Sequence, residues 1–133
     1  MQAVRFIKIA AVALTAVAVS AGSGWAFDEK PFDAKAFAAA QEAGKPVLVD
    51  AFAPWCPVCK AQQQVLGKLK QDAKYDALTV FKIDYDNQPD ALKSLDVRKQ
   101  STLIAFKGKA ETGRTVGDTK PSSITALIDT ALN

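Results

Sequence analysis

The chain reads PVLVDAFAPWCPVCK over residues 46–60, and this stretch decides the fold and the chemistry. Residues 47–53 form an apolar run broken by a single acid, Asp50, which predicts a strand buried on both faces. Pro57 then stands at a first helical turn, where its missing N–H costs nothing. We predict that this helix continues to about Tyr75, with Val58, Val65, Leu66 and Leu69 on its apolar side. The stretch is therefore a strand followed closely by a helix.

The two cysteines of the chain, Cys56 and Cys59, lie at the start of that helix. A helix N-terminus carries about half a positive charge and stabilises a thiolate over a thiol. Two residues between cysteines close too short a loop for a useful structural staple, since a staple gains most from a long loop. We therefore expect a redox pair, with Cys56 as the more exposed nucleophile and Cys59 as the buried resolving thiol. A structural disulfide is the alternative.

Outside this stretch the pattern predicts helices alternating with strands. Asp33 caps a first helix in which Phe37 and Ala40 point inward, and Gly44 ends it. The remaining elements follow from apolar spacing and turn residues: helices over 34–43, 87–95 and from Pro121, and strands over 78–84, 102–106 and 111–116. This order predicts an α/β fold with a central mixed sheet and helices on both faces.

Residues 1–26 have the composition of an export signal. Arg5 and Lys8 precede an uncharged stretch of apolar and small residues over 9–21, and small residues at 24 and 26 favour cleavage before Phe27. The alternative is an uncleaved membrane anchor, although the apolar stretch is short for a membrane span. We expect one domain over 27–133, located in the periplasm or otherwise outside the cytoplasm.

Composition excludes several functions. The chain has no histidine, which rules out catalysis by histidine and zinc sites with histidine ligands. Without Arg5 and Lys8 the chain has 15 basic and 14 acidic residues and no basic block, so we expect no nucleic-acid partner. We also expect no metal site and a monomer.

Four segments resemble the thioredoxin family over nearly the whole of residues 27–133. They are the strand and cysteine helix at 47–60, TVFKID at 79–84, DVR at 96–98 and TLIAFKGK at 102–109. The resemblance implies a thioredoxin fold, thiol–disulfide oxidoreductase activity on protein disulfides, and a redox-active Cys56–Cys59 disulfide with no other cofactor.

The resemblance also implies roles for residues around the cysteines. Asp50 resembles the family's buried acid. Burial should raise the pKa of its carboxyl and make it a proton acceptor for Cys59. An acid at a strand end that reaches solvent is the alternative. Lys82 is the expected charge partner of Asp50 on the adjacent strand, and a solvated lysine is the alternative.

Two further residues flank the cysteines. Trp55 is expected to cover the disulfide edge and to form part of a substrate surface, with simple packing as the alternative. Pro57 is expected to tune the redox properties of the pair, with a helix-start role as the alternative. Cys-Pro-x-Cys is similar to exported family members, both reductases of cytochrome c maturation and DsbA-type oxidases.

Ser101 departs from the family pattern, because it replaces the cis-proline before the threonine, here Thr102. A cis bond before a residue other than proline costs about 3 kcal/mol, so we expect a trans bond and a rearranged loop. The Ser101 hydroxyl is then expected to donate a hydrogen bond toward a thiolate. The missing proline is also expected to open the cysteines to a metal ion.

These features favour an exported reductase of protein disulfides. It would receive electrons from a membrane thiol reductant of the DsbD or CcdA type. The alternatives are a Cu(I) carrier that uses the two thiolates and a disulfide-forming oxidase or isomerase.

Overall fold

The computed structural model describes residues 26–133 of the chain. The expected export signal over 1–26 lies, apart from Ala26, outside the described residues. Among the residues that the structure describes, no helix has the length and apolar character needed to span a membrane.

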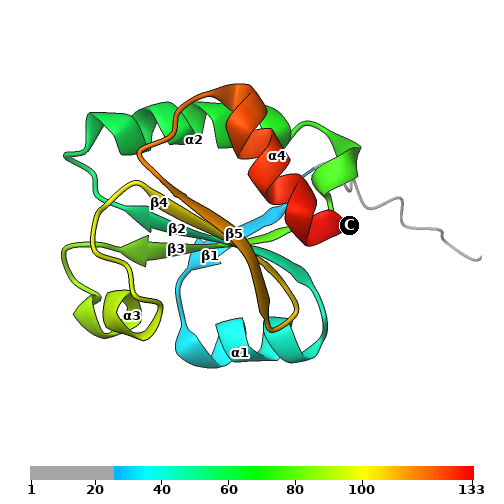
Figure 1. Cartoon of the computed structure of the whole chain (residues 1–133), viewed down its shortest axis with the longest axis horizontal. Helices are drawn as coiled ribbons and strands as arrows, with labels where there is room; N and C mark the ends of the chain where they lie inside the picture. Colours follow the sequence, from blue (N-terminus) through cyan, green and yellow to red (C-terminus); the bar gives the residue numbers. More distant parts are fainter. Residues whose placement is uncertain (1–25) are drawn as a thin grey trace, which may run out of the picture.

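A five-stranded mixed sheet forms the centre of the domain (Figure 1). Its strands lie in the order β1-β3-β2-β4-β5. The first three run parallel to one another, and β4 and β5 are antiparallel to their neighbours. The strand bounds are β1 (Asp28–Pro31), β2 (Pro46–Phe52), β3 (Thr79–Asp84), β4 (Thr102–Lys107) and β5 (Ala110–Val116). Because β2 is central and buried along most of its length, it can place an acid in the interior.

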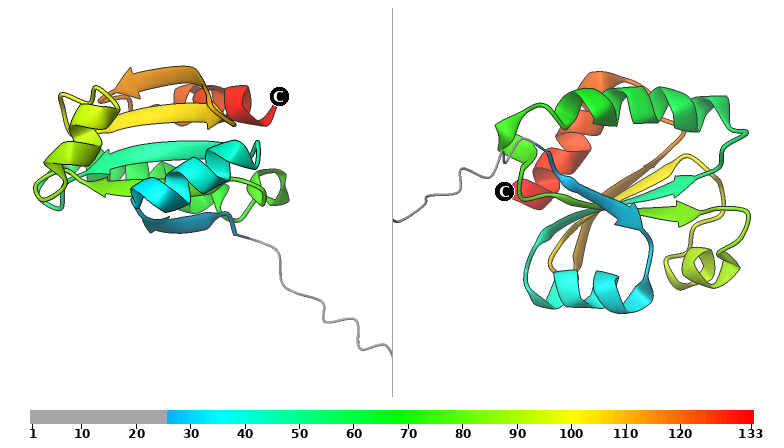
Figure 2. Two further views of the ribbon diagram at one scale, coloured as in Figure 1. Left: turned by 90° about the horizontal axis from the view of Figure 1, so that it is seen from below. Right: turned by 180° about the vertical axis from the view of Figure 1, so that it is seen from behind.

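Helices cover both faces of the sheet, as the sequence predicts (Figures 1 and 2). Helices α2 and α4 lie over one face, and α1 and α3 lie over the other. Their bounds are α1 (Ala34–Glu42), α2 (Pro57–Leu69), α3 (Pro89–Ser94) and α4 (Pro121–Leu132). Asp33 caps α1 through a 2.8 Å hydrogen bond from the Ala36 N–H, which confirms the predicted helix start.

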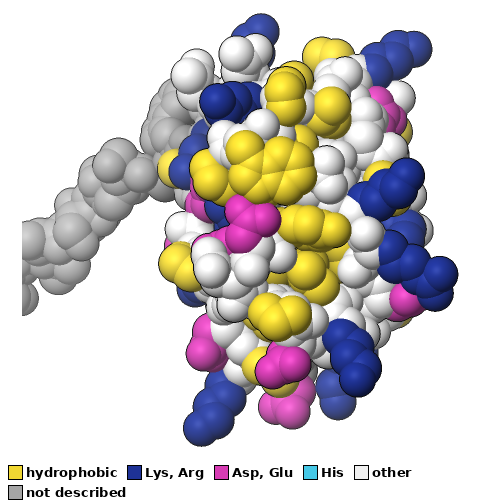
Figure 3. All heavy atoms as spheres, turned by 90° about the vertical axis from the view of Figure 1, so that its left-hand side faces the viewer, with side chains coloured by type: hydrophobic (Ala, Val, Ile, Leu, Met, Phe, Trp, Pro, Cys, Tyr) yellow, Lys and Arg dark blue, Asp and Glu magenta, His cyan; other side chains and the backbone are white. Residues whose placement is uncertain are grey.

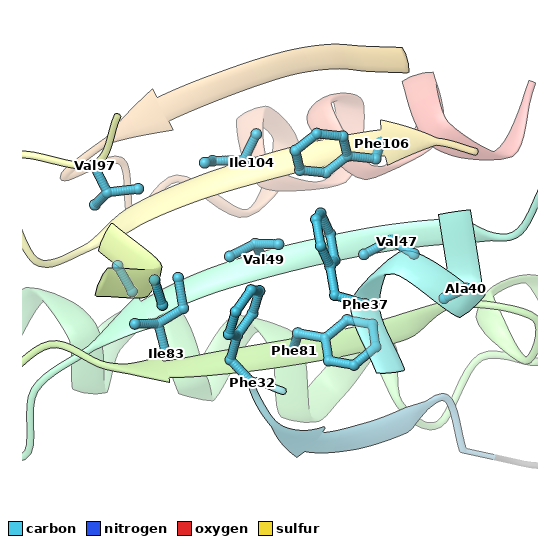
Figure 4. Close-up of a cluster of buried hydrophobic side chains, with 12 residues drawn as sticks. Phe32, Phe37, Ala40, Val47, Val49, Phe81, Ile83, Val97, Ile104 and Phe106 are labelled. Atoms are coloured by element: carbon cyan, nitrogen blue, oxygen red, sulfur yellow. The ribbon is translucent and has the colours of Figure 1, made fainter. Parts of the chain in front are cut away.

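Each face of the sheet has its own apolar core. On the α1 and α3 face, Phe37 packs its ring against Phe81 and Phe106, with centroids 5.7 and 5.3 Å apart (Figure 4). On the other face, Leu48, Leu103 and residues of α2 and α4 form a second cluster. Burial on both faces explains why β2 and β4 read as continuous apolar runs.

Two predictions about the elements are wrong, and one strand was not predicted. Helix α2 ends at Leu69, and a separate 3-10 turn over Ala73–Tyr75 follows it, because Asp72 caps that turn through the Lys74 N–H. Val58, expected on the apolar side of α2, is 37% exposed. Strand β1 was not predicted, since four residues without alternation give no signal of their own.

Candidate active site

The cysteines lie where strand β2 gives way to helix α2. Cys56 is the N-cap of α2 in an extended conformation, and Pro57 is the first helical residue. The Cys56 N–H donates to the Ala53 carbonyl at 3.1 Å, which closes a tight turn after the strand. The expected helix-start position of Pro57 is therefore present.

The two sulfur atoms have different surroundings. The Sγ of Cys56 accepts a hydrogen bond from the Cys59 N–H at 3.1 Å, so it occupies the place of a helix-capping oxygen. Burial raises the pKa of the Cys59 thiol to about 11, and its hydrogen bonding with Cys56 acts in the same direction. The ionised form is thus strongly disfavoured at Cys59. This asymmetry makes Cys56 the better placed of the two to act as a thiolate.

The expected exposure of Cys56 is wrong. Cys56 is 1% exposed and Cys59 is 0% exposed, so exposure does not distinguish them. Both pack with Ala53, against the partly buried Phe52 and Tyr85. Little of Cys56 is therefore open to a substrate in this structure.

Tyr85 packs against the cysteine cluster, and the sequence analysis did not identify it as a site residue. Its hydroxyl donates to the Arg98 carbonyl at 3.3 Å, which ties the loop after β3 to the segment before β4. Nothing in the local pattern indicates this position, because the contact joins parts of the chain distant in sequence.

Asp50 lies in the interior, on the central strand β2 of the sheet. The residue is 0% exposed, and burial raises the pKa of its carboxyl to about 6. One oxygen, Oδ2, accepts a hydrogen bond from Gln63 Nε2 at 2.5 Å. The other oxygen, Oδ1, is buried and has no hydrogen-bond partner among residues 26–133. The buried acid expected from the sequence is therefore present, and the alternative of a carboxylate that reaches solvent is wrong.

Lys82 is the register partner of Asp50 on β3, and its charge lowers the pKa of the Asp50 carboxyl against the effect of burial, as expected of a charge partner. Lys82 Nζ donates to Gln63 Oε1 at 2.9 Å and forms an ion pair with Glu29 Oε1 at 2.9 Å. It also lies 4.6 Å from the centre of the Phe52 ring. The Gln63 amide therefore separates the two groups.

Glu29 joins this network from strand β1, which sequence reasoning missed. It pairs with Lys82 and also with Lys70, whose Nζ lies 3.0 Å from Oε2. Partial burial opposes ionisation of Glu29, but the hydrogen bonds and charges of Lys82 and Lys70 together lower its pKa below the ordinary value. The position of Gln63 could have been inferred from the sequence, because it follows Cys59 by four residues and therefore lies on the same face of the helix.

Trp55 is 57% exposed. Its indole Nε1 donates to the Asp86 carboxylate, at 2.9 Å to Oδ2 and 3.2 Å to Oδ1. Figure 3 shows hydrophobic side chains running down the side of the molecule at which β2 and β3 end, with charged groups beside them. An exposed ring fixed by a hydrogen bond suits a contact surface, and whether substrate uses it stays a prediction.

Ser101 follows a trans peptide bond, as expected, and adopts a φ of 61°. Its N–H donates to the Ala51 carbonyl at 2.8 Å. Its hydroxyl donates to the Gln100 carbonyl at 2.5 Å, so the expected hydrogen bond toward a thiolate is wrong. Ser101 is 5% exposed, and with both cysteines buried the expected opening toward a metal ion is also absent.

Two neighbours hold this loop in place. The Thr102 hydroxyl donates to the Lys99 carbonyl at 2.7 Å. The buried Gln62 donates from Nε2 to the carbonyls of Ser101 and Asp118, at 3.0 and 2.9 Å. Within residues 26–133, no group of three or more cysteine, aspartate or glutamate side chains is arranged to hold a metal ion.

Comparisons with known proteins identify the family. The thioredoxin family model matches residues 28–130. Thioredoxin Asp f 29 of Aspergillus fumigatus is 33% identical over 100 residues, which cover 74% of this chain and 91% of that protein. A bifunctional thioredoxin reductase/thioredoxin of Mycobacterium leprae is 38% identical over 85 residues, which cover 64% of this chain. The match spans only 18% of the length of that bifunctional protein.

A solved structure agrees. The crystal structure of Trxlp from Edwardsiella tarda matches with a TM-score of 0.73 and 40% identity, and covers 76% of this chain and 98% of that one. The domain is therefore a thiol–disulfide oxidoreductase domain built on the thioredoxin fold. The chain belongs to the thioredoxin family, with Cys56 and Cys59 in its Cys-x-x-Cys spacing.

Proposed function

We propose that this protein is an exported reductase of protein disulfides that works through the Cys56 and Cys59 thiols. The observation that carries the proposal is the asymmetry of the pair. Cys56 Sγ accepts a helix N–H at 3.1 Å, whereas burial raises the pKa of Cys59 to about 11. One sulfur is thus placed to attack, and the other stays a thiol until a base removes its proton.

The chemistry proceeds in two exchanges. In the first, the Cys56 thiolate attacks one sulfur of the substrate disulfide and forms a mixed disulfide, while the other substrate sulfur leaves with the electron pair. In the second, the Asp50 carboxylate takes the proton of Cys59, and the Cys59 sulfur attacks Cys56. The substrate sulfur that was bound to Cys56 then leaves with its electron pair. The substrate has now gained two electrons, and the protein holds a Cys56–Cys59 disulfide.

Asp50 is suited to this base role. The pKa of its carboxyl, raised by burial to about 6, leaves it largely ionised at neutral pH yet far more basic than an ordinary aspartate. The charges of Asp50 and Cys59 also act on each other, because Asp50 contributes to the raised pKa of the thiol. Loss of the Cys59 proton to Asp50 would remove this repulsion.

Two observations support the reducing direction. The Asp50 and Lys82 pair resembles the reducing branch of the family. Between β3 and β4 the chain carries only the short helix α3 (Pro89–Ser94), whereas DsbA-type oxidases typically carry a large helical insertion.

Export is supported by the charged, apolar and small-residue pattern of residues 1–26. Phe27 is 2% exposed and packs in the core, which favours a domain boundary just before it. A reductase outside the cytoplasm needs electrons from across a membrane. We therefore propose a membrane thiol reductant of the DsbD or CcdA type as its partner, and a monomer as its working form.

The reduction potential of the Cys56–Cys59 pair tests this proposal. A value near about −270 mV, measured by equilibration with glutathione, is expected for a reductase. A value near about −120 mV contradicts it and indicates the oxidase. The Cu(I) carrier is tested by titrating the reduced protein with Cu(I) beside a Cys56→Ser control. We expect weak uptake of less than one equivalent.

A further inference from the structure

The side chain of Gln63 fills the space between the buried acid and the lysine beside it. Its Nε2 lies 2.5 Å from Asp50 Oδ2, and its Oε1 lies 2.9 Å from Lys82 Nζ. The chemistry of the partners fixes this orientation of the amide. An ammonium group only donates and a carboxylate only accepts, so the amide must present its oxygen to Lys82 and its nitrogen to Asp50.

This arrangement makes the two oxygens of Asp50 unequal. Oδ2 accepts the Gln63 N–H, while Oδ1 is buried and has no hydrogen-bond partner in the part of the chain that the structure describes. A proton bound to Oδ1 would leave the Gln63 hydrogen bond intact, whereas a proton on Oδ2 would face an N–H donor. The free oxygen is therefore the one on which a proton is accepted at least cost.

Gln63 also separates Asp50 from Lys82, which lies at the surface. A surface hollow of about 660 Å³ is lined by residues that include Lys82, Glu29 and Phe52. Lys82 has 29% of its side chain exposed, whereas Asp50 is 0% exposed. An amide neither releases nor takes up protons at neutral pH, so the Gln63 side chain that joins Asp50 to Lys82 does not pass a proton between them.

We infer that Gln63 is a positioning residue, which holds Oδ2 of Asp50 and thereby directs the proton of Cys59 to Oδ1. This inference rests on the proposed function, in which Asp50 is the base for Cys59. It goes beyond that proposal by assigning one oxygen to the chemistry and by closing the route toward Lys82.

The charged and titratable groups acting on Asp50 come from three elements. Lys82 on β3 and the Gln63 hydrogen bond from α2 lower its pKa, while Glu29 on β1 raises it. Cys59 on α2 interacts with its charge. Strand β4 places the apolar Leu103 opposite Asp50. Burial raises the pKa of Asp50, and the Gln63 hydrogen bond is one of the interactions that lower it. Removing the Gln63 donor should therefore raise the pKa further and make Asp50 harder to ionise.

The test is a carbon NMR titration of the Asp50 carboxyl in the reduced protein, with Gln63→Met compared with wild type. Met keeps the length of the side chain and removes both hydrogen bonds. We expect the titration midpoint to move upward by about one pH unit, the size expected for losing one hydrogen bond to a charged group. Gln64→Met is the matched control, since Gln64 is exposed on the same helix.

A second variant guards against a folding defect in the first. Gln63→Leu also removes the donor to Asp50 and adds no charge, so it should raise the midpoint as well. The inference is overturned if neither variant shifts the Asp50 midpoint by more than Gln64→Met does. The titration does not depend on redox activity, so it succeeds or fails separately from the proposed function.

A kinetic measurement then tests the consequence for Cys59. In single-turnover experiments, the acid limb of the resolving step should move upward in pH with Gln63→Met, by the same amount as the Asp50 midpoint. In an Asp50→Asn background, Gln63→Met should cause no further change in the pH profile. A further change there contradicts an effect that acts through Asp50.

Discussion

Cys56 and Cys59 are positioned by one short segment of chain, whereas Asp50 depends on groups from three further sites in the fold. The cysteines need only the end of β2, the tight turn after it and the first turn of α2. The network around Asp50 draws Gln63 from the second turn of α2, Lys82 from β3 and Glu29 from β1. The nucleophile is thus fixed by local geometry, and the base by long-range packing. Substitutions in the two regions should therefore fail in different ways.

The largest effect is expected in the local region. Cys56→Ser should lower the rate of insulin disulfide reduction by at least about a thousandfold, because no thiolate remains to attack. The serine oxygen can still accept the Cys59 N–H, so the free energy of unfolding should change by no more than about 1 kcal/mol.

The rate is measured with insulin and a chemical reductant, and the stability by urea unfolding. Retention of a tenth or more of the wild-type rate would show that Cys56 is not the nucleophile.

The next effect concerns the base. Burial raises the pKa of Asp50 from 3.8 to about 6, so the folded state binds a proton more tightly than the unfolded chain does. The tighter proton binding adds to the free energy of unfolding. This contribution is fully present below about pH 4 and is lost as the pH rises through about 6. Asp50→Asn removes the buried charge, and should raise the free energy of unfolding at pH 8 by up to about 3 kcal/mol.

Urea unfolding of the reduced proteins at pH 8 and pH 4 measures this effect. The pH 4 comparison is the internal control, because there the two proteins should differ little. An Asn variant that is less stable than wild type at pH 8 would contradict a buried, destabilising carboxylate.

The smallest effect lies at the outer end of the network. Glu29→Gln removes the ion pairs with Lys82 and Lys70, and should lower the free energy of unfolding at pH 7 by about 0.5–1 kcal/mol, since these partners are partly exposed. The folded-state pKa of Glu29 is lowered, so this contribution is present above its unfolded value of 4.5 and is lost as the pH falls through the lowered value.

Urea unfolding at low and at high salt measures the contribution of Glu29. Glu42→Gln, at an exposed glutamate near the end of α1, serves as the control. A loss at Glu29 that salt does not reduce would indicate a packing role in place of an electrostatic one.

The contrast between the two regions also explains what could be predicted from the sequence. The capping role of Asp33, the helix-start position of Pro57 and the burial of Asp50 depend on neighbours within a few residues or on apolar runs, and the sequence predicted all three. The Glu29 contact could not be predicted, because strand β1 exists through its pairing with β3 and has no alternation of its own.

Ser101 and Cys56 show the same limit. Replacement of a proline indicated a trans bond at Ser101, but the direction of its hydroxyl depends on a positive φ that the local sequence does not determine. The helix-start position suggested an exposed Cys56, yet the residue is 1% exposed in a cluster that packs against Phe52 and Tyr85.

The order in which the two sulfurs act is tested most directly by trapping. Cys59→Ser, mixed in reduced form with a disulfide-bonded protein substrate, should accumulate a covalent adduct on Cys56 at close to one equivalent, as measured by mass spectrometry. Cys56→Ser, which keeps the Cys59 thiol, should form almost none. An adduct on Cys59 in the second variant, formed as fast as that on Cys56 in the first, would contradict the account.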